Sequence, residues 1–533
     1  MNTPRRRTRI HLALTEPRTL TKPTMKRTLR AFAAIGLLTT VPASAQRYLT
    51  EQFSAVDVQS NVEYGQNYTV MSGAPVLAPL LMDIYTPQGD TETDRPLIVY
   101  LHTGSFLPRY INNLPTGDKT DSATVEMCRR FAKKGYVVAA VSYRKGWNPA
   151  SPSEMTRKET IIRAVYRSMQ DAKTAVRFMR KSITEGNPYG ISNDKVVIGG
   201  QGSGGYTALA YATLQETSEI QLLKFFNTET STFMVDPAIM GDSEGLGGVA
   251  SLNHDNHTGY STEINMIFNI GGALGDSTWL EAGEVPICSV HGVNDPFAPY
   301  MNGTVFVPGT ALAVVNVDGS GRVTQLANEY GNNDIWLTPP FSDAVTNYAQ
   351  GALTGTVNEG NEGLFPITAP QNASGPWEWW DTTAVVNGCA VLGIDQAGAY
   401  QRMANGYLSN PLLSALGTVG GRARAHAYID TLQNFITPRM YRALALNVGL
   451  DEHSAIAQGV TVYPNPVARY TEITSTETII RNYVVYDNQG RMVRNGQVNS
   501  DRFTFDREGL SAGSYFIELF FKEGSLTRKL ILE

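Results

Sequence analysis

Apolar and polar residues alternate in blocks along residues 80–300 and predict strands and helices in turn. Apolar residues recur at intervals of three and four from Ile161 to Met179, which marks one face of a helix, and a further helix is predicted for Ser122–Lys134. Short, near-continuous apolar segments have the length of strands: Leu81–Tyr85, Leu97–Leu101, Tyr136–Val141 and Lys195–Ile198. Strands that are nearly continuous in apolar residues indicate a buried, mostly parallel sheet flanked by helices. The pattern therefore predicts an α/β fold.

The C-terminal part of the chain has a different pattern. From Val460 onwards, short alternating segments are separated by turn residues, as where Tyr483–Tyr486 is followed by Asp487-Asn488-Gln489-Gly490. Such segments predict a small antiparallel β-sandwich. We therefore expect an α/β domain over residues 46–450, a linker over 451–459 and an all-β domain over 460–533.

Residues 1–45 have the pattern of a secretory signal peptide. Basic residues precede an apolar run from Ala31 to Val41, which is followed by Ala43-Ser44-Ala45. Met25 opens a signal of ordinary length and is a second candidate for the start of the chain. The apolar run is too short for an ordinary transmembrane helix, and we expect no transmembrane segment after signal removal.

Charge and cysteine content narrow the classes of partner. The net charge of the whole chain is −5, and removal of the basic residues 1–45 makes it more negative. An acidic protein is not expected to bind nucleic acid or an anionic membrane. Cys128, Cys288 and Cys389 lack the short spacing of metal ligands, so we expect buried thiols with at most one disulfide, and no cofactor.

Five segments, in chain order, resemble the carboxylesterase and lipase branch of the α/β-hydrolases. They are LMDIYTP (81–87), VYLHTGSF (99–106), GYVVAAVSYR (135–144), QDAKTAVRFMR (170–180) and VPICSVHGVNDPFAPY (285–300). The resemblance implies an α/β-hydrolase fold. It also implies that a long insertion, at about residues 301–420, lies over the active-site face like a cap.

The second of these segments resembles the H-G-G-G-F oxyanion motif of the family. The resemblance places His102, Thr103 and Gly104 at the oxyanion hole. Thr103 and Ser105 stand where the family has glycines, so the geometry of the hole is expected to depart from the family pattern. In this family His102 would support the loop and would not act as a base.

The nucleophile elbow of the family, G-x-S-x-G, corresponds to Gly200-Gln201-Gly202-Ser203-Gly204. Aligned without a gap, Gly200 and Gly204 take the two small positions, and Gly202 takes the place of the serine. The other alignment makes Ser203 the nucleophile, but it puts Gln201 where a small residue is needed. The first alignment is favoured, and a glycine tolerates the strained backbone of an elbow.

A serine nucleophile needs a histidine base and an acid that orients it. The resemblance places the acid at Asp295, although an aspartate before Pro296 is also typical of a turn. Only His426 and His453 follow, and His453 lies in the linker. His426 shares the polar face of a predicted helix with Asp430 and Gln433, so a solvent-exposed histidine is the favoured interpretation.

Two further segments contain candidate binding residues. The Asp236–Asp276 stretch is rich in Asp, Asn and Gly and includes His254 and His257, but no metal-ligand spacing is present, and a polar loop is favoured over a calcium or transition-metal site. The sequence GPWEWWD (375–381) is either a platform for a sugar or apolar ligand or core packing of the cap. Core packing is favoured because aromatic residues dominate cores.

The C-terminal domain resembles the type A sorting domain of the Bacteroidetes type IX secretion system. The matching residues are Val462-Tyr463-Pro464-Asn465-Pro466, the turn at Asp487 and Gly490, Leu510–Tyr515 and Lys529. The resemblance implies an address for the type IX secretion machinery and an extracellular or cell-surface location. The alternative is a generic β-sandwich binding module.

Two functions from different classes remain. One is a secreted carboxylic-ester hydrolase that uses Ser203, Asp295 and His426 through a covalent acyl-enzyme. The other is a hydrolase-derived protein without covalent catalysis. It binds a small molecule, ester or carbohydrate in the former active-site pocket, or it is a cell-surface or matrix protein. Gly202 and the missing base favour the second.

Overall fold

The computed structural model describes residues 47–446, except 72, 309, 370 and 371, and residues 459–533, except 477, 488–490, 523 and 524. The predicted signal peptide, Met25, His453, Gly490 and the linker up to residue 458 lie outside the described residues.

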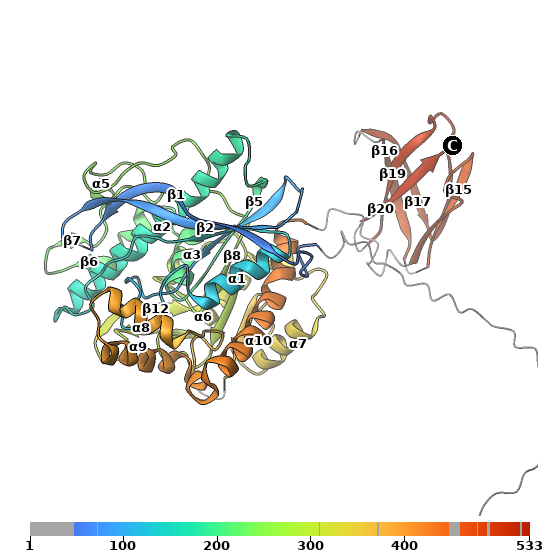
Figure 1. Cartoon of the computed structure of the whole chain (residues 1–533). Coiled ribbons are helices and arrows are strands. Elements are labelled where there is room, and N and C mark those ends of the chain that lie inside the picture. Colours follow the sequence, from blue (N-terminus) through green and yellow to red (C-terminus); the bar gives the residue numbers. More distant parts are fainter. Residues whose placement is uncertain are drawn as a thin grey trace, which may run out of the picture. The chain divides into compact units, whose positions relative to one another are not determined.

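An eight-stranded sheet forms the centre of the first domain, in the order β1-β2-β4-β3-β5-β8-β10-β13 (Figure 1). Strand β1 pairs antiparallel with β2, and β2 pairs antiparallel with β4, whereas all other pairs are parallel. The strands are β1 (Val56–Thr69), β2 (Val76–Pro87), β3 (Arg95–Leu101), β4 (Val137–Val141), β5 (Ile191–Gln201), β8 (Met266–Ile270), β10 (Ile287–Gly292) and β13 (Leu364–Ile367). The predicted mostly parallel sheet is therefore confirmed.

Both faces of this sheet are covered, because successive side chains of a strand point to opposite sides. In β3, Val99 packs into one core with α2, α3 and α6, while Ile98 packs into a second core with α1 and α10. The main helices are α1 (Ser122–Lys133), α2 (Glu154–Thr184), α3 (Ser203–Thr213), α6 (Ser320–Glu329), α7 (Ala344–Leu353) and α10 (Pro411–Ala443). Every residue of β3 and β4 is buried, as expected for strands between two helical layers.

Local signals delimit the helices. At the start of α2, the Ser153 side chain accepts a hydrogen bond from the Thr156 N–H, which is the role of an N-cap serine. After α1, Gly135 has a φ of +110° and lets the chain leave the helix, a conformation that disfavours residues with a Cβ.

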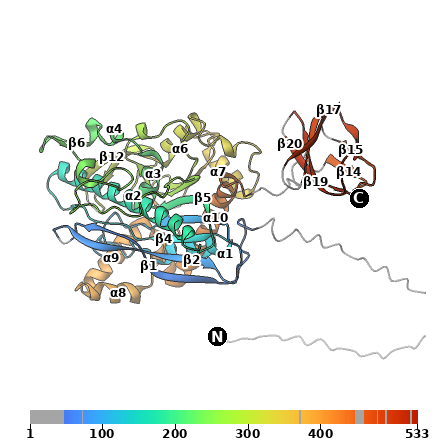
Figure 2. The same ribbon diagram turned by 90° about the horizontal axis from the view of Figure 1, so that it is seen from above.

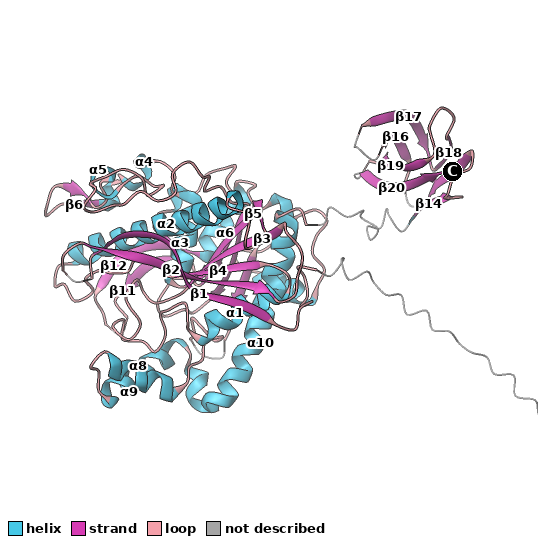
Figure 3. Ribbon diagram, turned by 45° about the horizontal axis from the view of Figure 1, so that its top comes forward, coloured by secondary structure: helices cyan, strands magenta, loops and turns pink. Residues whose placement is uncertain are grey.

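The segment predicted as an insertion, residues 301–420, also supplies α6, α7 and β13 to the central domain. Helices α8 (Thr382–Val391) and α9 (Gln396–Ser409) pack together as a pair (Figure 3), with a small core that includes Trp380 and Met403. A second sheet contains β11 (Asn302–Phe306), β12 (Ala313–Gly319) and β9 (Ala273–Leu274). Further short α-helices and strands are α4 (Thr217–Ile220), α5 (Pro237–Met240), β6 (Phe226–Asn227) and β7 (Thr232–Phe233).

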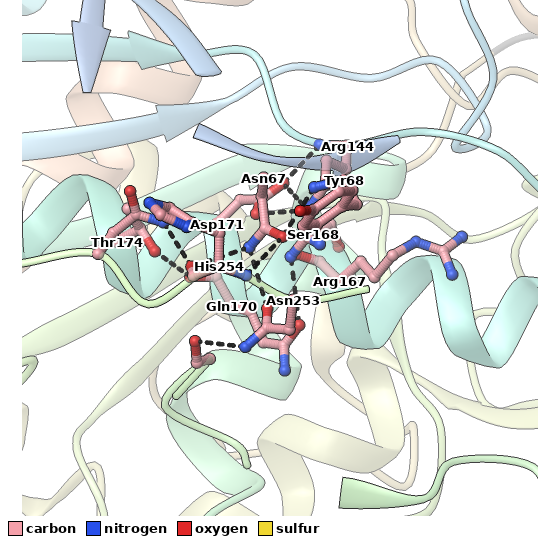
Figure 4. A network of polar contacts seen from close by, with 12 residues as sticks. Asn67, Tyr68, Arg144, Arg167, Ser168, Gln170, Asp171, Thr174, Asn253 and His254 are labelled. Carbon is pink, nitrogen blue, oxygen red and sulfur yellow. Dashed lines mark hydrogen bonds and ion pairs between the residues drawn. The ribbon is translucent and has the colours of Figure 1, made fainter. Parts of the chain in front are cut away.

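A buried polar network joins α2 to β1 and to the Asp- and Asn-rich loop (Figure 4). The carboxylate of Asp171 accepts hydrogen bonds from the backbone N–H and the Nε of Arg144. Asn67 donates to the Oδ1 of Asn253 at 3.0 Å, and Asn253 donates in turn to the carbonyls of Gly245 and Gly247. These amides fix the path of the loop. Within the described ranges, no group of three or more His, Cys, Asp or Glu side chains is arranged to hold a metal ion.

The C-terminal domain consists of two antiparallel sheets, β14-β15-β18 and β17-β16-β19-β20 (Figure 2). The strands are β14 (Val460–Tyr463), β15 (Tyr470–Ser475), β16 (Ile480–Tyr486), β17 (Met492–Ser500), β18 (Arg502–Asp506), β19 (Gly513–Phe520) and β20 (Ser525–Leu532). Alternate residues such as Ile473, Val485 and Ile517 form its core. The predicted all-β domain is confirmed.

Two further findings concern the whole described part. Cys128, Cys288 and Cys389 are free and buried. Of the helices in the described ranges, none combines the length and apolar character needed to cross a membrane.

Candidate functional site

Gly202 forms the turn between the end of β5 and the start of α3. Its φ of 53° and ψ of −117° are open to glycine and costly for a residue with a Cβ. A Cβ on Gly200 would collide with the backbone of Gly204, and one on Gly204 would collide with the carbonyl of Leu101. The strand and the helix thus approach as closely as the small positions of the predicted elbow require.

Thr103 fills the space in front of this turn. A Cβ placed on Gly202 would lie 2.5 Å from the Oγ1 of Thr103, well inside van der Waals contact. The Thr103 hydroxyl therefore takes up the volume in which a side chain at Gly202 would begin.

Ser203 is the first residue of α3, with only 5% of its surface exposed. The Tyr143 hydroxyl donates to the carbonyl oxygen of His102 at 2.7 Å, so the Ser203 hydroxyl is the donor in the 2.9 Å contact with Tyr143. Burial raises the pKa of Tyr143 and keeps its hydroxyl protonated. The Ser203 proton is thus directed to a tyrosine oxygen.

The predicted oxyanion loop follows β3 and is tightly folded. His102 is fully buried and stacks on Tyr143 at 4.7 Å between ring centres. Burial, with a contribution from Lys145, lowers the pKa of His102 to about 3, so the ring is neutral. Gly104 has a φ of +140°, and a Cβ there would lie 2.8 Å from the Cα of Gly117. This packing explains why glycine is needed at position 104.

Asp295 follows β10, as the resemblance places the acid. Its Oδ1 accepts from the backbone N–H groups of Phe297 at 2.7 Å and Ala298 at 3.1 Å, which is the turn-forming role. Its Oδ2 lies 3.6 Å from the Nε2 of His291. The fully buried His291 also contacts the Ser320 hydroxyl through Nδ1 at 2.7 Å. His291 belongs to the segment VPICSVHGVNDPFAPY, but no role was predicted for it.

His426 lies on α10, and its contacts are with residues outside the elbow. Its Nδ1 is 3.7 Å from Glu126, its Nε2 is 3.3 Å from the Nε of Arg422, and its ring packs edge-on against Trp379. About a quarter of the side chain is exposed, and partial burial lowers its pKa. These contacts do not include Ser203 or Asp295. The prediction that Gln433 lies on a solvent-facing polar side of this helix is wrong. Gln433 is buried, and its side chain donates to the carbonyl of Met127.

The loop after β13 brings an unexpected carboxyl group to the site. Glu378 is 7% exposed, and its Oε1 accepts from the Nε2 of Gln201 at 2.6 Å. Burial, with smaller contributions from Asp121 and Asp295, raises the pKa of Glu378 to about 8. Sequence reasoning missed Glu378, and the only local signal is an acid inside an aromatic run. Of that run, Trp377 packs in the second core, with α1 and α10, and Trp380 packs with the α8–α9 pair.

A cavity of about 170 Å³ opens at the elbow. Thr103, Gly202, Ser203, Asp295 and Glu378 line its polar end. Its walls elsewhere are apolar and come mainly from α2, α3 and the second sheet, including Ile162, Val165, Met169, Ala210, Val315 and Val317. His426 is not among the lining residues. The site therefore combines a small polar end with a long apolar wall.

Comparison with known families follows the same division of the chain. Residues 82–308 match the BD-FAE family, and residues 461–533 match the Secretion system C-terminal sorting domain. The chain thus resembles the α/β-hydrolases over residues 82–308, which is less than half of its length. Its sorting domain marks this α/β-hydrolase-fold protein for export through the type IX secretion system, to the cell surface or beyond it.

The solved structures found by comparison include esterases. Thermogutta terrifontis esterase 2 in its apo form is 18% identical, with a TM-score of 0.29 over 47% of this chain and 76% of that chain. The same esterase with bound propionate is 16% identical, with a TM-score of 0.33 over 69% of this chain and 96% of that chain. A hyperthermophilic esterase from the archaeon Pyrobaculum calidifontis is 22% identical, with a TM-score of 0.20 over 30% and 40% of the two chains. The comparison with curated proteins found no match.

Proposed function

We propose that this esterase-like protein binds a ligand non-covalently in the cavity at its elbow and does not form an acyl-enzyme. The observation that carries the proposal is the pair Gly202 and Thr103. Covalent catalysis at the elbow tip needs a hydroxyl or thiol on the residue at the turn, whereas Gly202 has no side chain and Thr103 takes up the volume in front of it.

The surroundings of Ser203 and His426 support the proposal. A serine becomes a nucleophile when a base accepts its proton. The Ser203 hydroxyl instead donates to the hydroxyl of Tyr143, whose own proton goes to the carbonyl of His102. His426 has Glu126, Arg422 and Trp379 as its neighbours.

The alternative is a carboxylic-ester hydrolase that uses Ser203, Asp295 and His426. Its support is the position of Ser203 and Asp295 in the wall of the same cavity. It would require His426, on α10, to leave Glu126, Arg422 and Trp379 and reach the elbow.

A fluorophosphonate probe tests the proposal on the purified full chain, with Ser203→Ala as the matched control. We expect no labelling of the unaltered protein and no difference between the two proteins in the hydrolysis of short-chain p-nitrophenyl esters. Labelling at Ser203, together with ester turnover that Ser203→Ala abolishes, would overturn the proposal. Circular dichroism of both proteins establishes that they are folded.

A further inference from the structure

The ionisable side chains in the wall of the cavity are acidic, and none is basic. Asp295 and Glu378 line the polar end, and the described lining residues include no Arg, Lys or His. A charge buried in a low-dielectric site is costly unless an opposite charge pairs with it. An anionic head group, such as a carboxylate, would enter this end without a cation to pair with.

Three residues that line the cavity have a buried side-chain polar atom without a hydrogen-bond partner among the described residues. These atoms are the indole Nε1 of Trp377, the Oε1 of Gln201 and the hydroxyl of Tyr206. Trp377 and Gln201 are 1% and 4% exposed, and all three residues line the cavity. Trp377 can only donate, and the Gln201 oxygen can only accept. Because unpartnered buried polar groups lower stability, this set favours a bound group that both donates and accepts.

Glu378 adds a second donor. Asp121 and Asp295 are the acidic groups that face it, Gln201 donates to its Oε1, and Arg424 reaches only its backbone carbonyl. With its pKa raised to about 8, the carboxyl group is protonated at neutral pH. The polar end therefore offers the Trp377 N–H and the Glu378 carboxyl as donors and the Gln201 oxygen as an acceptor. Such a set favours an uncharged bound group.

The rest of the cavity continues as an apolar arm. Ile162, Val165 and Met169 of α2 line it on one side, and Val315 and Val317 of β12 line it on another. Phe306 of β11 belongs to the same wall and is 46% exposed, so the arm reaches the protein surface there. An aliphatic chain buried in such an arm gains free energy in proportion to the apolar area removed from water.

We infer that the cavity takes an amphiphile with an aliphatic tail in the apolar arm and an uncharged hydroxyl or amide head group at Trp377, Gln201 and Glu378. This inference rests on the proposed non-covalent function and names its ligand class. The head group accepts from the indole N–H of Trp377 and donates to the Oε1 of Gln201. Carboxylates of the same chain length are selected against by Asp295 and by the lack of a cation in the wall.

Isothermal titration of the full chain with decanamide, 1-decanol, decanoate and butanamide at pH 7 tests this inference. We expect decanamide and 1-decanol to bind at least tenfold more tightly than decanoate, because decanoate is anionic. We expect butanamide to bind at least tenfold more weakly than decanamide, because it leaves the apolar arm empty. Equal or tighter binding of decanoate, or no binding of any ten-carbon ligand, would overturn the inference.

Trp377→Phe keeps the aromatic ring and removes the N–H, and we expect it to weaken decanamide binding by roughly three- to tenfold, as loss of one neutral hydrogen bond does. Trp379→Phe is the matched control, since Trp379 packs against His426 and is not a lining residue. Equal effects of the two substitutions would contradict the assigned head-group site. Ester turnover and probe labelling report separately on the proposed function, so its failure is distinguishable from a wrong ligand class.

Discussion

The hydroxyl of Thr103 lies 2.5 Å from the point at which a Cβ on Gly202 would stand. Gly202 leaves room for the threonine hydroxyl, and a side chain at Gly202 would force that hydroxyl to move. The relationship joins the loop after β3 to the turn after β5, and these are the two segments that bear the oxyanion and nucleophile motifs of the fold.

Restoring a serine at the elbow is expected to destabilise the protein. Gly202→Ser combines a positive φ with a collision against Thr103, and we expect the free energy of unfolding to fall by roughly 2–4 kcal/mol in urea denaturation. The double variant Thr103→Gly/Gly202→Ser should recover part of this loss, because it removes the collision and keeps the strain.

Gly247→Ser is the control for Gly202→Ser. Gly247 also has a positive φ, of +72°, but nothing lies within 4 Å of its Cβ position. We expect it to cost only the strain, about 1–2 kcal/mol. Equal losses for the two serine substitutions, or no recovery in the double variant, would show that Thr103 does not restrict the elbow.

Replacement of His426 distinguishes the two functions. We expect His426→Ala to leave decanamide affinity and background ester hydrolysis unchanged, because its contacts are with Glu126, Arg422 and Trp379. The measurements are isothermal titration and p-nitrophenyl butyrate turnover. If the variant lost a measurable esterase activity that Ser203→Ala also removes, the hydrolase alternative would stand.

The buried ion pair between Arg144 and Asp171 is expected to be essential for stability. Asp171 is fully buried and accepts both the backbone and the side chain of Arg144, so Asp171→Asn leaves a buried guanidinium without its counter-charge. We expect a loss of about 3–5 kcal/mol in the free energy of unfolding.

Asp94→Asn provides the comparison for Asp171→Asn. Asp94 pairs with Lys195, and 58% of its side chain is exposed. Removing this surface ion pair should cost under about 1 kcal/mol. A similar loss in both variants, measured by urea denaturation, would mean that the Asp171 network contributes no more than a surface pair.

Glu378 is expected to make stability depend on pH. A glutamate in an unfolded chain has a pKa of about 4.3, whereas that of Glu378 is raised to about 8. The folded protein therefore binds the additional proton between these values, and its free energy of unfolding falls as the pH rises from about 5 to about 8. Glu378→Gln should make this fall shallower in thermal denaturation across the same range.

Glu284 also has a pKa raised to about 8 and is present in both proteins, so some dependence on pH should remain in Glu378→Gln. Identical profiles for the two proteins would show that Glu378 is ionised in the folded state at neutral pH.

Much of the fold could be predicted because its signals are local. The period of apolar residues from Ile161 to Met179 lies within α2, and the apolar run at Leu97–Leu101 lies within β3. The glycines around Gly202 are a local signal as well, because a tight strand-to-helix turn restricts residues that are adjacent in the chain. The change in period near Val460 coincides with the start of β14, the first strand of the all-β part.

What the sequence by itself determined is therefore the order of strands and helices, the turn at Gly202 and the address for export. Only the tertiary structure decided which side chains surround that turn. Glu378 reaches Gln201 across 177 positions of the chain, whereas His426 packs beside Glu126. Such neighbours depend on how strand β13 and helix α10 pack against the rest of the sheet. The burial that results from this packing sets the charge and the hydrogen bonding of the site, and no local sequence pattern reveals it.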